Sequence, residues 1–269
     1  MLSALAISAG VGLLLALAVV AQGEQGIHTL PAAPAATHVG PANETVAVQG
    51  GAGPGVERGP RPASAAGFTA YLPFVARNHD PLLLYFDDFA DPNSGWYTAE
   101  DDGWKVGYLD GEYQILLKKM QWGGMVTPDL VLPENFSIEV DARQASGNAS
   151  SYGLMFGIQF IGATYEGYQV VVYPAAGVYL LEKRNADGTW PLLIDWTYNE
   201  AIGQGMATNH LRVDRSGATI SIYINGTQVT TFTDSSFTGA GRDAGVRAYS
   251  YDSVPVDVRF DNLAAYRLP

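Results

Sequence analysis

The chain of 269 residues contains no cysteine, and this absence excludes several kinds of chemistry together. Without a thiol there are no disulfides, no thiolate nucleophile, no cysteine-ligated zinc and no iron–sulfur cluster. Packing, or an ion held by oxygen ligands, must therefore stabilise the fold. Catalytic motifs are absent as well. There is no Gly-x-Ser-x-Gly elbow, no His-Glu-x-x-His pair and no phosphate-binding glycine loop, so serine hydrolase, zinc hydrolase and nucleotide chemistry lose support.

Positive charge is scarce. The chain has 15 Lys and Arg against 27 Asp and Glu, a net charge of −12, of which residues 82–269 carry −11. An acidic surface repels phosphate backbones and anionic lipid headgroups, so we expect no nucleic-acid partner and no binding to a membrane face. Cations and neutral molecules remain as ligands.

The N-terminal 23 residues carry no charged side chain and are apolar from Leu5 to Val20. Small residues at Val19-Val20-Ala21 suit signal peptidase, so we expect a signal peptide over residues 1–21 and a secreted or cell-surface protein. Because no Lys or Arg precedes the apolar run, an uncleaved anchor stays open as an alternative, and it is the one membrane contact we expect. A buried core helix is disfavoured because no partner helix is visible.

Residues 22–66 are rich in Ala, Pro and Gly and have no periodicity. Such a segment cannot bury enough apolar surface to fold, so residues 22–81 are predicted to be a flexible linker. From Leu82 the sequence changes to short β-rich runs separated by turn residues, with no helical periodicity. This spacing is typical of an all-β sandwich or barrel, so residues 82–269 are predicted to be one domain.

Two segments predict strands with particular clarity. Phe136–Arg143 alternates between an apolar face and a polar face that carries Glu139, Asp141 and Arg143. Asn225-Gly226 supplies the two positive-φ residues of a hairpin turn between strands in 219–232. The other predicted strands are Glu112–Leu117, Tyr152–Phe160, Tyr168–Tyr173, Val178–Glu182, His210–Asp214, Gly245–Tyr249 and Val256–Tyr266.

Five phrases of the sequence resemble the concanavalin A-like lectin/glucanase superfamily, especially its laminin-G-like branch and the domain of 3-keto-disaccharide hydrolases. In chain order they are Phe86–Trp96, Asp110–Ile115, His210–Val213, Ile222–Gly226 and Val258–Leu263. The resemblance covers about 185 residues. It implies a jelly-roll β-sandwich of two antiparallel sheets with a concave face. Because this fold serves lectins, adhesion modules and hydrolases alike, function must come from a site.

The resemblance also provides a test for catalysis. β-Glucanases of this superfamily carry Glu-x-Asp-x-x-Glu or Glu-x-Asp-x-Glu on one strand, and this chain has Glu139-Val-Asp141-Ala-Arg143. The first two carboxylates match, but an arginine stands where the third is expected. Because arginine stays charged and cannot donate a proton to a leaving oxygen, we assign no catalytic residue and favour a protein that is not an enzyme.

A binding surface is predicted instead. If Phe136–Arg143 and Tyr152–Phe160 form a hairpin, Asp141 lies opposite Gly153 and Glu139 opposite Met155. The glycines at 153 and 157 would then either leave room for a sugar or permit an overlying loop to approach. Tryptophans could supply stacking platforms, although most in a sandwich are buried. The predicted ligand-binding residues are Glu139, Asp141, Arg143, Gln159, Gln169, Tyr173 and Trp196.

A calcium site is a second hypothesis. Asp87 and Asp88 lie near the start of the domain and Asp261 near its end, and first and last strands pair in jelly rolls of this kind, so hard oxygen ligands could converge. The alternative is that these residues cap turns. Apart from structural calcium we expect no cofactor.

We therefore expect a secreted or surface-tethered, non-catalytic, lectin-like module that binds carbohydrate or an extracellular protein. The two alternatives are a glycoside-active enzyme of the 3-keto-disaccharide hydrolase type and a purely structural adhesion module.

Overall fold

The computed structural model describes residues 44–48, 82–147, 150–162 and 164–269. The predicted signal peptide and most of the predicted linker lie outside these residues. The described residues contain strands and turns and no helix. A helix long and apolar enough to cross a membrane is therefore not found among them.

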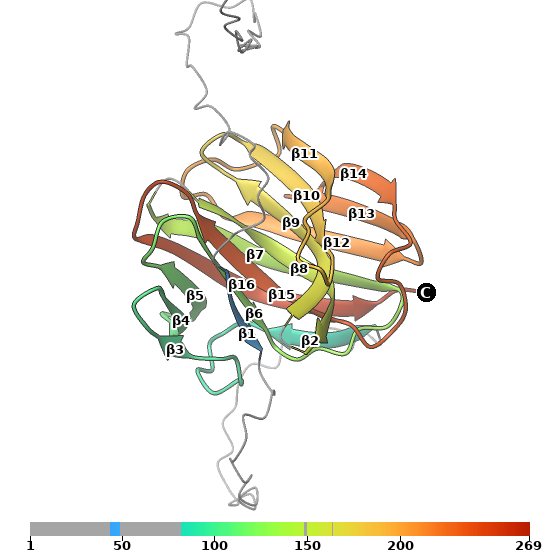
Figure 1. Ribbon diagram of the computed structural model, residues 1–269, viewed down its shortest axis with the longest axis horizontal. Helices are drawn as coiled ribbons and strands as arrows, with labels where there is room; N and C mark the ends of the chain where they lie inside the picture. The colour runs from blue at the N-terminus through green and yellow to red at the C-terminus, as the bar shows by residue number, and fades with distance from the viewer. Residues whose placement is uncertain (1–43, 49–81, 148–149, 163) are drawn as a thin grey trace, which may run out of the picture. The chain divides into compact units, whose positions relative to one another are not determined.

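Seven strands form one sheet, called sheet A here, which Figure 1 shows with its labels. Their order across the sheet is β1 (Glu44–Val48), β6 (Trp122–Thr127), β15 (Asp243–Ser250), β8 (Ser150–Ile161), β9 (Thr164–Tyr173), β10 (Val178–Arg184) and β11 (Leu192–Tyr198). All neighbours are antiparallel except β1, which runs parallel to β6.

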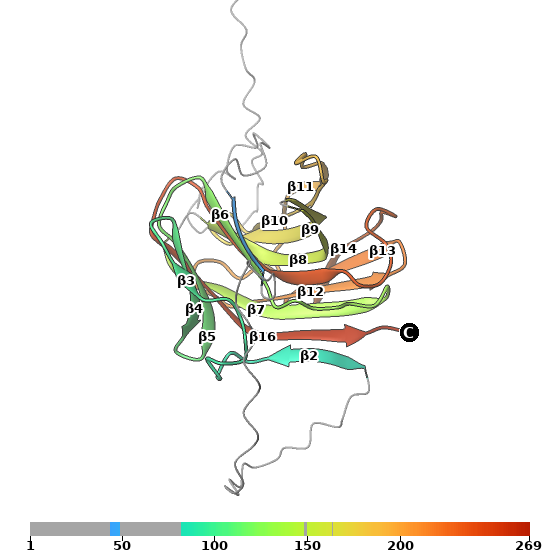
Figure 2. The same ribbon diagram turned by 60° about the horizontal axis from the view of Figure 1, so that its bottom comes forward.

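Sheet B contains nine strands, and all of its pairings are antiparallel. The strands are β14 (Thr227–Thr233), β13 (Thr219–Ile224), β12 (Asn209–Ser216), β7 (Phe136–Ser146), β16 (Val256–Arg267), β5 (Glu112–Leu117), β4 (Trp104–Leu109) and β3 (Ala99–Glu100), with β2 (Leu83–Asp87) beside the C-terminal half of β16. Figure 2 shows the two layers: β8, β9 and β10 belong to one, and β7, β12 and β16 to the other.

The hydrophobic core lies between the two sheets, and alternation along each strand supplies it. Phe136, Ile138, Val140 and Ala142 of β7 are all at most 2% exposed, as the sequence predicts. Residues of sheet A complete the core from the opposite side: Val126, Tyr152, Leu154, Phe156, Tyr168, Val170, Val172, Tyr179, Leu181, Ala244, Val246 and Ala248. The two-sheet, all-β architecture is the predicted fold class.

The predicted hairpin in sheet B is confirmed. Asn225 and Gly226 connect β13 to β14 with φ angles of 51° and 80°, the left-handed region that this turn requires. Five strands had no prediction, namely β1, β3, β4, β6 and β11. In β6 the reason is visible, because Gly123-Gly124 has the composition of a turn although both residues pair within sheet A.

One strand lies inside the predicted linker. β1, at Glu44–Val48, pairs in parallel with β6 from Glu44 opposite Gly123 to Val48 opposite Thr127. Thr45, Val46 and Val48 are β-branched residues, which favour an extended backbone. β6 would otherwise be the edge of sheet A, so β1 satisfies backbone groups that an edge leaves unpaired.

The predicted pairing of Phe136–Arg143 with Tyr152–Phe160 is wrong. These segments are β7 and β8, and they lie in opposite sheets: β7 pairs with β12 and β16, whereas β8 pairs with β9 and β15. Their apolar faces pack against each other across the core instead of side by side. Glu139 and Asp141 therefore do not face Met155 and Gly153, and the predicted groove that joined them does not form.

Candidate functional site

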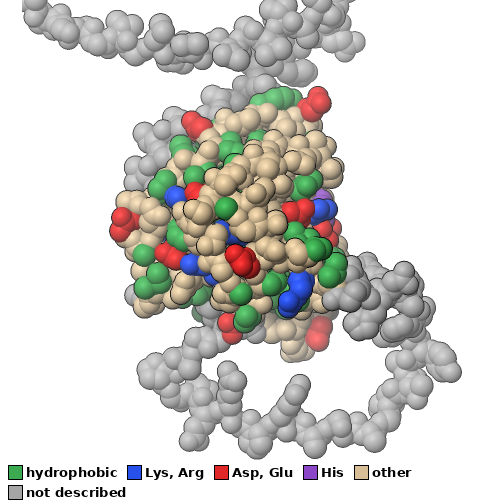
Figure 3. Space-filling view, turned by 90° about the vertical axis from the view of Figure 1, so that its right-hand side faces the viewer, with side chains coloured by type: hydrophobic (Ala, Val, Ile, Leu, Met, Phe, Trp, Pro, Cys, Tyr) green, Lys and Arg blue, Asp and Glu red, His purple; other side chains and the backbone are tan. Residues whose placement is uncertain are grey.

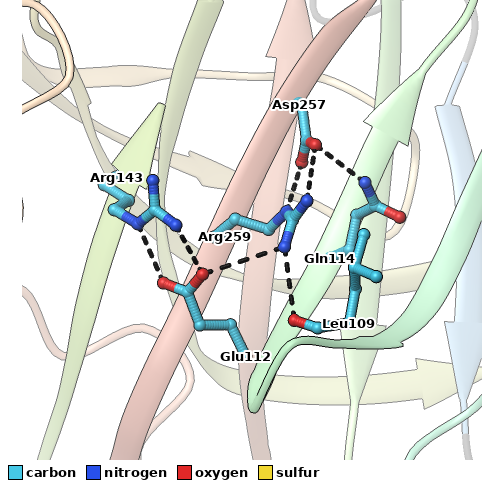
Figure 4. A network of polar contacts seen from close by, with 6 residues as sticks. All are labelled: Leu109, Glu112, Gln114, Arg143, Asp257 and Arg259. Atoms are coloured by element: carbon cyan, nitrogen blue, oxygen red, sulfur yellow. Dashed lines mark hydrogen bonds and ion pairs between the residues drawn. The ribbon is translucent and has the colours of Figure 1, made fainter. Parts of the chain in front are cut away.

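The polar side of β7 forms part of the outer face of sheet B. Arg143 there donates two hydrogen bonds to Glu112, from Nε to Oε1 at 2.8 Å and from Nη2 to Oε2 at 2.5 Å. Arg259 contacts the same carboxylate at 3.8 Å and is held by Asp257 at 2.6 and 2.8 Å. Figure 4 shows that these side chains come from β5, β7 and β16. Arg143 thus forms an ion pair that joins β7 to β5.

Glu139 and Asp141 have a different partner, His210 of β12. Nδ1 of His210 lies 2.8 Å from Oδ1 of Asp141, and Nε2 lies 3.6 Å from Oε2 of Glu139. The contact with Glu139, followed by that with Asp141, raises the pKa of His210, while the contact with His210 lowers the pKa of Glu139. A lowered pKa keeps Glu139 ionised, which suits an ion pair or a nucleophile and does not suit a proton donor.

The outer face of sheet B carries both signs of charge in contact. Arg212 donates to Asp214 at 2.8 and 2.5 Å, and its guanidinium lies 4.6 Å from the ring centroid of Tyr223. On the side of the molecule drawn in Figure 3, acidic and basic side chains likewise lie next to one another among uncharged ones. The charged side chains of this face are thus already paired with one another, so we place the candidate binding surface elsewhere.

Gln169, Tyr173 and Trp196 are brought together on the outer face of sheet A. Gln169 and Tyr173 lie four residues apart on β9, which places both on the same side, and the rings of Tyr173 and Trp196 are 6.2 Å apart. Gln159 does not join them. A β-bulge at Gly157, where φ is 63°, shifts the alternation of β8, and Gln159 turns to the opposite side from Met155.

A buried row of polar side chains crosses this face, and we call it the polar trio: Gln169, Glu182 and Arg247, each at most 4% exposed. Gln169 lies directly opposite Glu182 and donates from Nε2 to Oε1 of that carboxylate. Nη1 of Arg247 donates to Oε1 of Gln169 from the far side of β8. Arg247 can reach across because its neighbour on β8, Gly153, has no side chain.

Aromatic side chains flank the polar trio in two groups. The Trp190 group is Phe160, Tyr165, Arg184 and Trp190. The guanidinium of Arg184 lies 4.2 Å from the ring centroid of Tyr165 and 5.8 Å from that of Trp190, close enough for cation–π attraction. Arg247 of the polar trio lies 5.4 Å from the same indole.

The Trp196 group is Tyr173, Trp196, Tyr249 and Tyr251. Ring centroids are 4.9 to 6.2 Å apart, at the tilted and edge-on angles that aromatic pairs favour. Tyr251 donates to Ser151 at 3.0 Å and Tyr249 to Gln121 at 3.0 Å, so the hydroxyl groups are held in place. Trp190, Trp196, Tyr249 and Tyr251 are partly exposed. By contrast, Trp96 and Trp104 belong to the core.

Gly153 meets neither of the roles considered for it. An added Cβ at Gly153 would lie 2.0 Å from the carbonyl oxygen of Val170 on the adjacent β9. At Gly245 it would lie 2.2 Å from the carbonyl oxygen of Val126 on β6. The glycines therefore allow neighbouring strands, and not an overlying loop, to approach closely.

The sequence reasoning missed Glu182 and Arg247, and it included Trp190 only among the five tryptophans that could supply stacking platforms. Glu182 and Arg247 both lie in predicted strands. Arg247 alternates with Val246 and Ala248, so the pattern itself could have placed it on the outer face. Trp190 lies before β11, in a turn with no periodic signal.

The predicted calcium residues lie at a corner of sheet B. The first and last strands of the domain pair as expected, with Asp87 opposite Leu263. Asp87 accepts hydrogen bonds from the backbone of Phe89 at 2.8 Å and from Ser94 Oγ at 2.6 Å. Asp88 and Asp261 accept from the backbones of Ala90 and Asn262 at 3.2 and 2.7 Å. In the described part of the chain, no three His, Cys, Asp or Glu side chains are grouped to hold a metal ion. Calcium here stays a prediction.

Two packed sheets in this order, antiparallel except for β1, form a jelly-roll β-sandwich with the concanavalin A-like fold. No protein-family model and no curated protein matches the chain. Several solved structures do resemble the chain. A protein of unknown function with a galectin-like fold from Bacillus subtilis is 9% identical, with a TM-score of 0.54 over 69% of this chain and 96% of that one. A β-glucanase from Bacillus licheniformis is 12% identical, with a TM-score of 0.51 over 69% and 98%. The κ-carrageenase from Pseudoalteromonas carrageenovora, in complex with an oligotetrasaccharide, is 11% identical, with a TM-score of 0.51 over 74% and 99%. At these identities the likeness establishes the fold alone.

Proposed function

We propose that this chain is a secreted or surface-tethered, non-catalytic module that binds carbohydrate through the outer face of sheet A. The observation that carries the proposal is the polar trio flanked by two groups of partly exposed aromatic rings. Ligand sites combine apolar and aromatic walls with a few placed polar groups, and aromatic rings suit the apolar faces of sugars. The β-glucanase and the carrageenase with its oligotetrasaccharide support the proposal, since both proteins share this fold and act on carbohydrate.

The experiment is a binding panel of polysaccharides, with barley β-glucan, laminarin, xylan, κ-carrageenan and polygalacturonate, read by affinity electrophoresis and calorimetry. We expect the full chain to bind at least one of them. Trp196→Ala should weaken binding by about tenfold, the effect of losing about 1.4 kcal/mol at an aromatic contact. Tyr223→Ala, on the outer face of sheet B, is the matched control and should leave binding unchanged.

Two other outcomes would each favour a different function. Failure to bind every polysaccharide, with both variants folded, would overturn the proposal and favour an adhesion module or a protein partner. Release of reducing sugar that is abolished by Glu182→Gln would favour a glycoside-active enzyme. We expect no release, because glycosidases need two carboxylates across the scissile bond and the polar trio supplies one.

A further inference from the structure

Arg184, the last residue of β10, differs from several other arginines of the chain in its partners. Arg143, Arg212 and Arg259 each donate to a carboxylate from Nε and Nη2 together, the two nitrogens on one edge of the guanidinium. Through this edge an arginine binds both oxygens of an acidic group at once. Among the residues that the structure describes, no carboxylate forms an ion pair with Arg184.

The Nε–Nη2 edge of Arg184 has no acceptor in the described part of the chain. Both hydrogen bonds of this side chain come from Nη1, to Oγ1 of Thr164 at 2.8 Å and to the backbone carbonyl oxygen of Tyr165. Nε is buried and has no hydrogen-bond partner, whereas Nη2 has none and is not buried. Because an unpaired donor is unfavourable in a folded protein, this edge suits an acceptor that a ligand brings, and Nη2 is the nitrogen that the ligand meets first.

The guanidinium of Arg184 is held beside an aromatic ring that a sugar can reach. It lies 4.2 Å from the ring centroid of Tyr165, which is 3% exposed, and 5.8 Å from that of Trp190. Arg184 and Trp190 are both partly exposed. Since Tyr165 and the two Nη1 hydrogen bonds already fix the guanidinium, little side-chain freedom is lost when a ligand binds.

The two acidic side chains nearest to Arg184 in the sequence have other partners. Asp187 accepts hydrogen bonds from Thr189, from the backbone nitrogen at 2.9 Å and from Oγ1 at 2.7 Å. Glu182 accepts from Gln169 within the polar trio. Neither carboxylate therefore neutralises Arg184 by direct contact.

We propose that the carbohydrate bound by this chain is acidic, and that Arg184 receives a carboxylate or a sulfate ester from a sugar residue that stacks on Trp190. This inference rests on the proposed carbohydrate-binding function and adds the chemical class of the ligand. The indole takes the apolar face of the sugar ring, and the guanidinium takes the anionic oxygens of its substituent. A single sugar residue with its acidic substituent is large enough to meet both side chains, because their separation is 5.8 Å.

The acidity of the domain is compatible with such a ligand at physiological salt. Residues 82–269 carry a net charge of −11, which repels a polyanion at a distance. At an ionic strength of about 0.15 M the Debye length is about 8 Å, so an acidic group in contact with Arg184 interacts mainly with that guanidinium. Binding is therefore measured at this ionic strength.

The first test compares polysaccharides that share a backbone and differ in the acidic group. The pairs are polygalacturonate with its fully methyl-esterified form and κ-carrageenan with its desulfated form. Calorimetry should show that the acidic member of at least one pair binds about tenfold tighter or more, and the pair that responds identifies the carboxylate or the sulfate. Equal affinities within both pairs, or binding to neutral polysaccharides alone, would overturn the inference and leave carbohydrate binding intact. Absence of binding to any polysaccharide would overturn the proposed function itself.

The second test uses Arg184→Gln, with Arg212→Gln as the matched control. Arg212 also lies against a tyrosine ring, but on the outer face of sheet B, so its substitution removes the same charge elsewhere. Arg184→Gln should abolish the preference for the acidic member and leave affinity for the neutral member unchanged, whereas Arg212→Gln should preserve both. A preference that survives Arg184→Gln, or that both variants lose equally, would contradict the inference.

Two further variants separate the roles of the charge, the guanidinium and the indole, with melting temperature as the check on folding. Arg184→Lys keeps the charge without the two-nitrogen edge, so it should retain only part of the preference, and it replaces Arg184→Gln if that variant does not fold. Trp190→Ala should weaken binding of both members of the pair, because stacking does not depend on the acidic group. An undiminished preference in Arg184→Lys, or binding unaffected by Trp190→Ala, would count against the proposed contacts.

Discussion

At the scale of single residues, His210 is held between two carboxylates on the outer face of sheet B. Its pKa is raised from the ordinary 6.5, and that of Glu139 is lowered from the ordinary 4.5. The histidine contributes stability that is complete below pH 6.5 and is lost as pH rises through its folded pKa. Glu139 contributes stability that is present above pH 4.5 and is lost as pH falls through its own. Together they support the β7–β12 pairing most between these two values.

We predict that Glu139→Gln will lower the pKa of His210, because it replaces the carboxylate whose contact with the imidazole contributes most to the shift. An NMR titration of the imidazole measures this directly. Stability should fall by at most about 1 kcal/mol, since the pair is partly exposed to solvent. Arg212→Gln, a change on the same strand as His210, is the control. An unchanged pKa of His210 in Glu139→Gln would contradict the assignment.

Asp243 is a buried acid at the start of β15. Its Oδ1 accepts hydrogen bonds from the backbones of Leu130 at 2.8 Å and Ala244 at 2.7 Å, and burial raises the pKa to about 6. A raised folded pKa favours the protonated acid, so its contribution to stability is complete below pH 3.8 and is lost as pH rises through about 6.

Asp243→Asn should therefore stabilise the protein above pH 6, by up to about 2 kcal/mol, because the amide keeps the acceptor oxygen without the charge. Urea unfolding of wild type and variant on either side of pH 6 measures the difference, which should grow with pH. Asp88→Asn, on an exposed turn, is the matched control. A difference that is independent of pH would show that the charge of Asp243 does not matter.

At the scale of elements, the position of Gly153 on β8 combines two constraints. A Cβ there would collide with β9, and the empty position lets Arg247 reach Gln169. Gly153→Ala should destabilise the protein by about 3 kcal/mol or more, because backbone on a packed strand cannot move aside cheaply. Thermal unfolding measures the loss. Gly103→Ala, where the nearest atoms belong to side chains at 3.3 Å and beyond, should cost much less. Equal effects of the two substitutions would contradict the close approach of the strands.

Alternation predicted which side chains face the core but not which strands are neighbours. The apolar positions of β7 and β8 are consistent with pairing in one sheet and with packing across two, and local sequence does not distinguish these arrangements. The same limit explains why the residues predicted to form one site are divided between the two sheets. Gln169, Tyr173 and Trp196 lie on the outer face of sheet A, whereas Glu139, Asp141 and Arg143 lie on that of sheet B. The bulge at Gly157 turns Gln159 to the opposite side of sheet A, and strict alternation along β8 does not predict this change.

At the scale of the whole molecule, sheet A includes a strand that lies before Leu82, where composition placed the start of the domain. The change to β-rich sequence at Leu82 marks the start of continuous strand formation, yet β1 lies earlier, at Glu44–Val48. β1 has only five residues, and no neighbouring segment of the sequence pairs with it, so the sequence indicates this strand only weakly. Its stability comes from pairing with the edge of β6. Composition therefore located the body of the sandwich and missed one strand of a sheet.

A chain that begins at Leu82 should be less stable than one that begins at Glu44. Without β1, the backbone groups of β6 that face it lose their hydrogen-bond partners, and an exposed edge strand invites pairing with another chain. We expect a lower melting temperature for the shorter chain and a concentration-dependent dimer in light scattering. Val46→Pro in the longer chain should produce the same change, because proline cannot donate a backbone hydrogen bond to a ladder. Equal melting temperatures and a monomer in every case would show that β1 adds nothing to the sheet, and that the domain is complete from Leu82 onward.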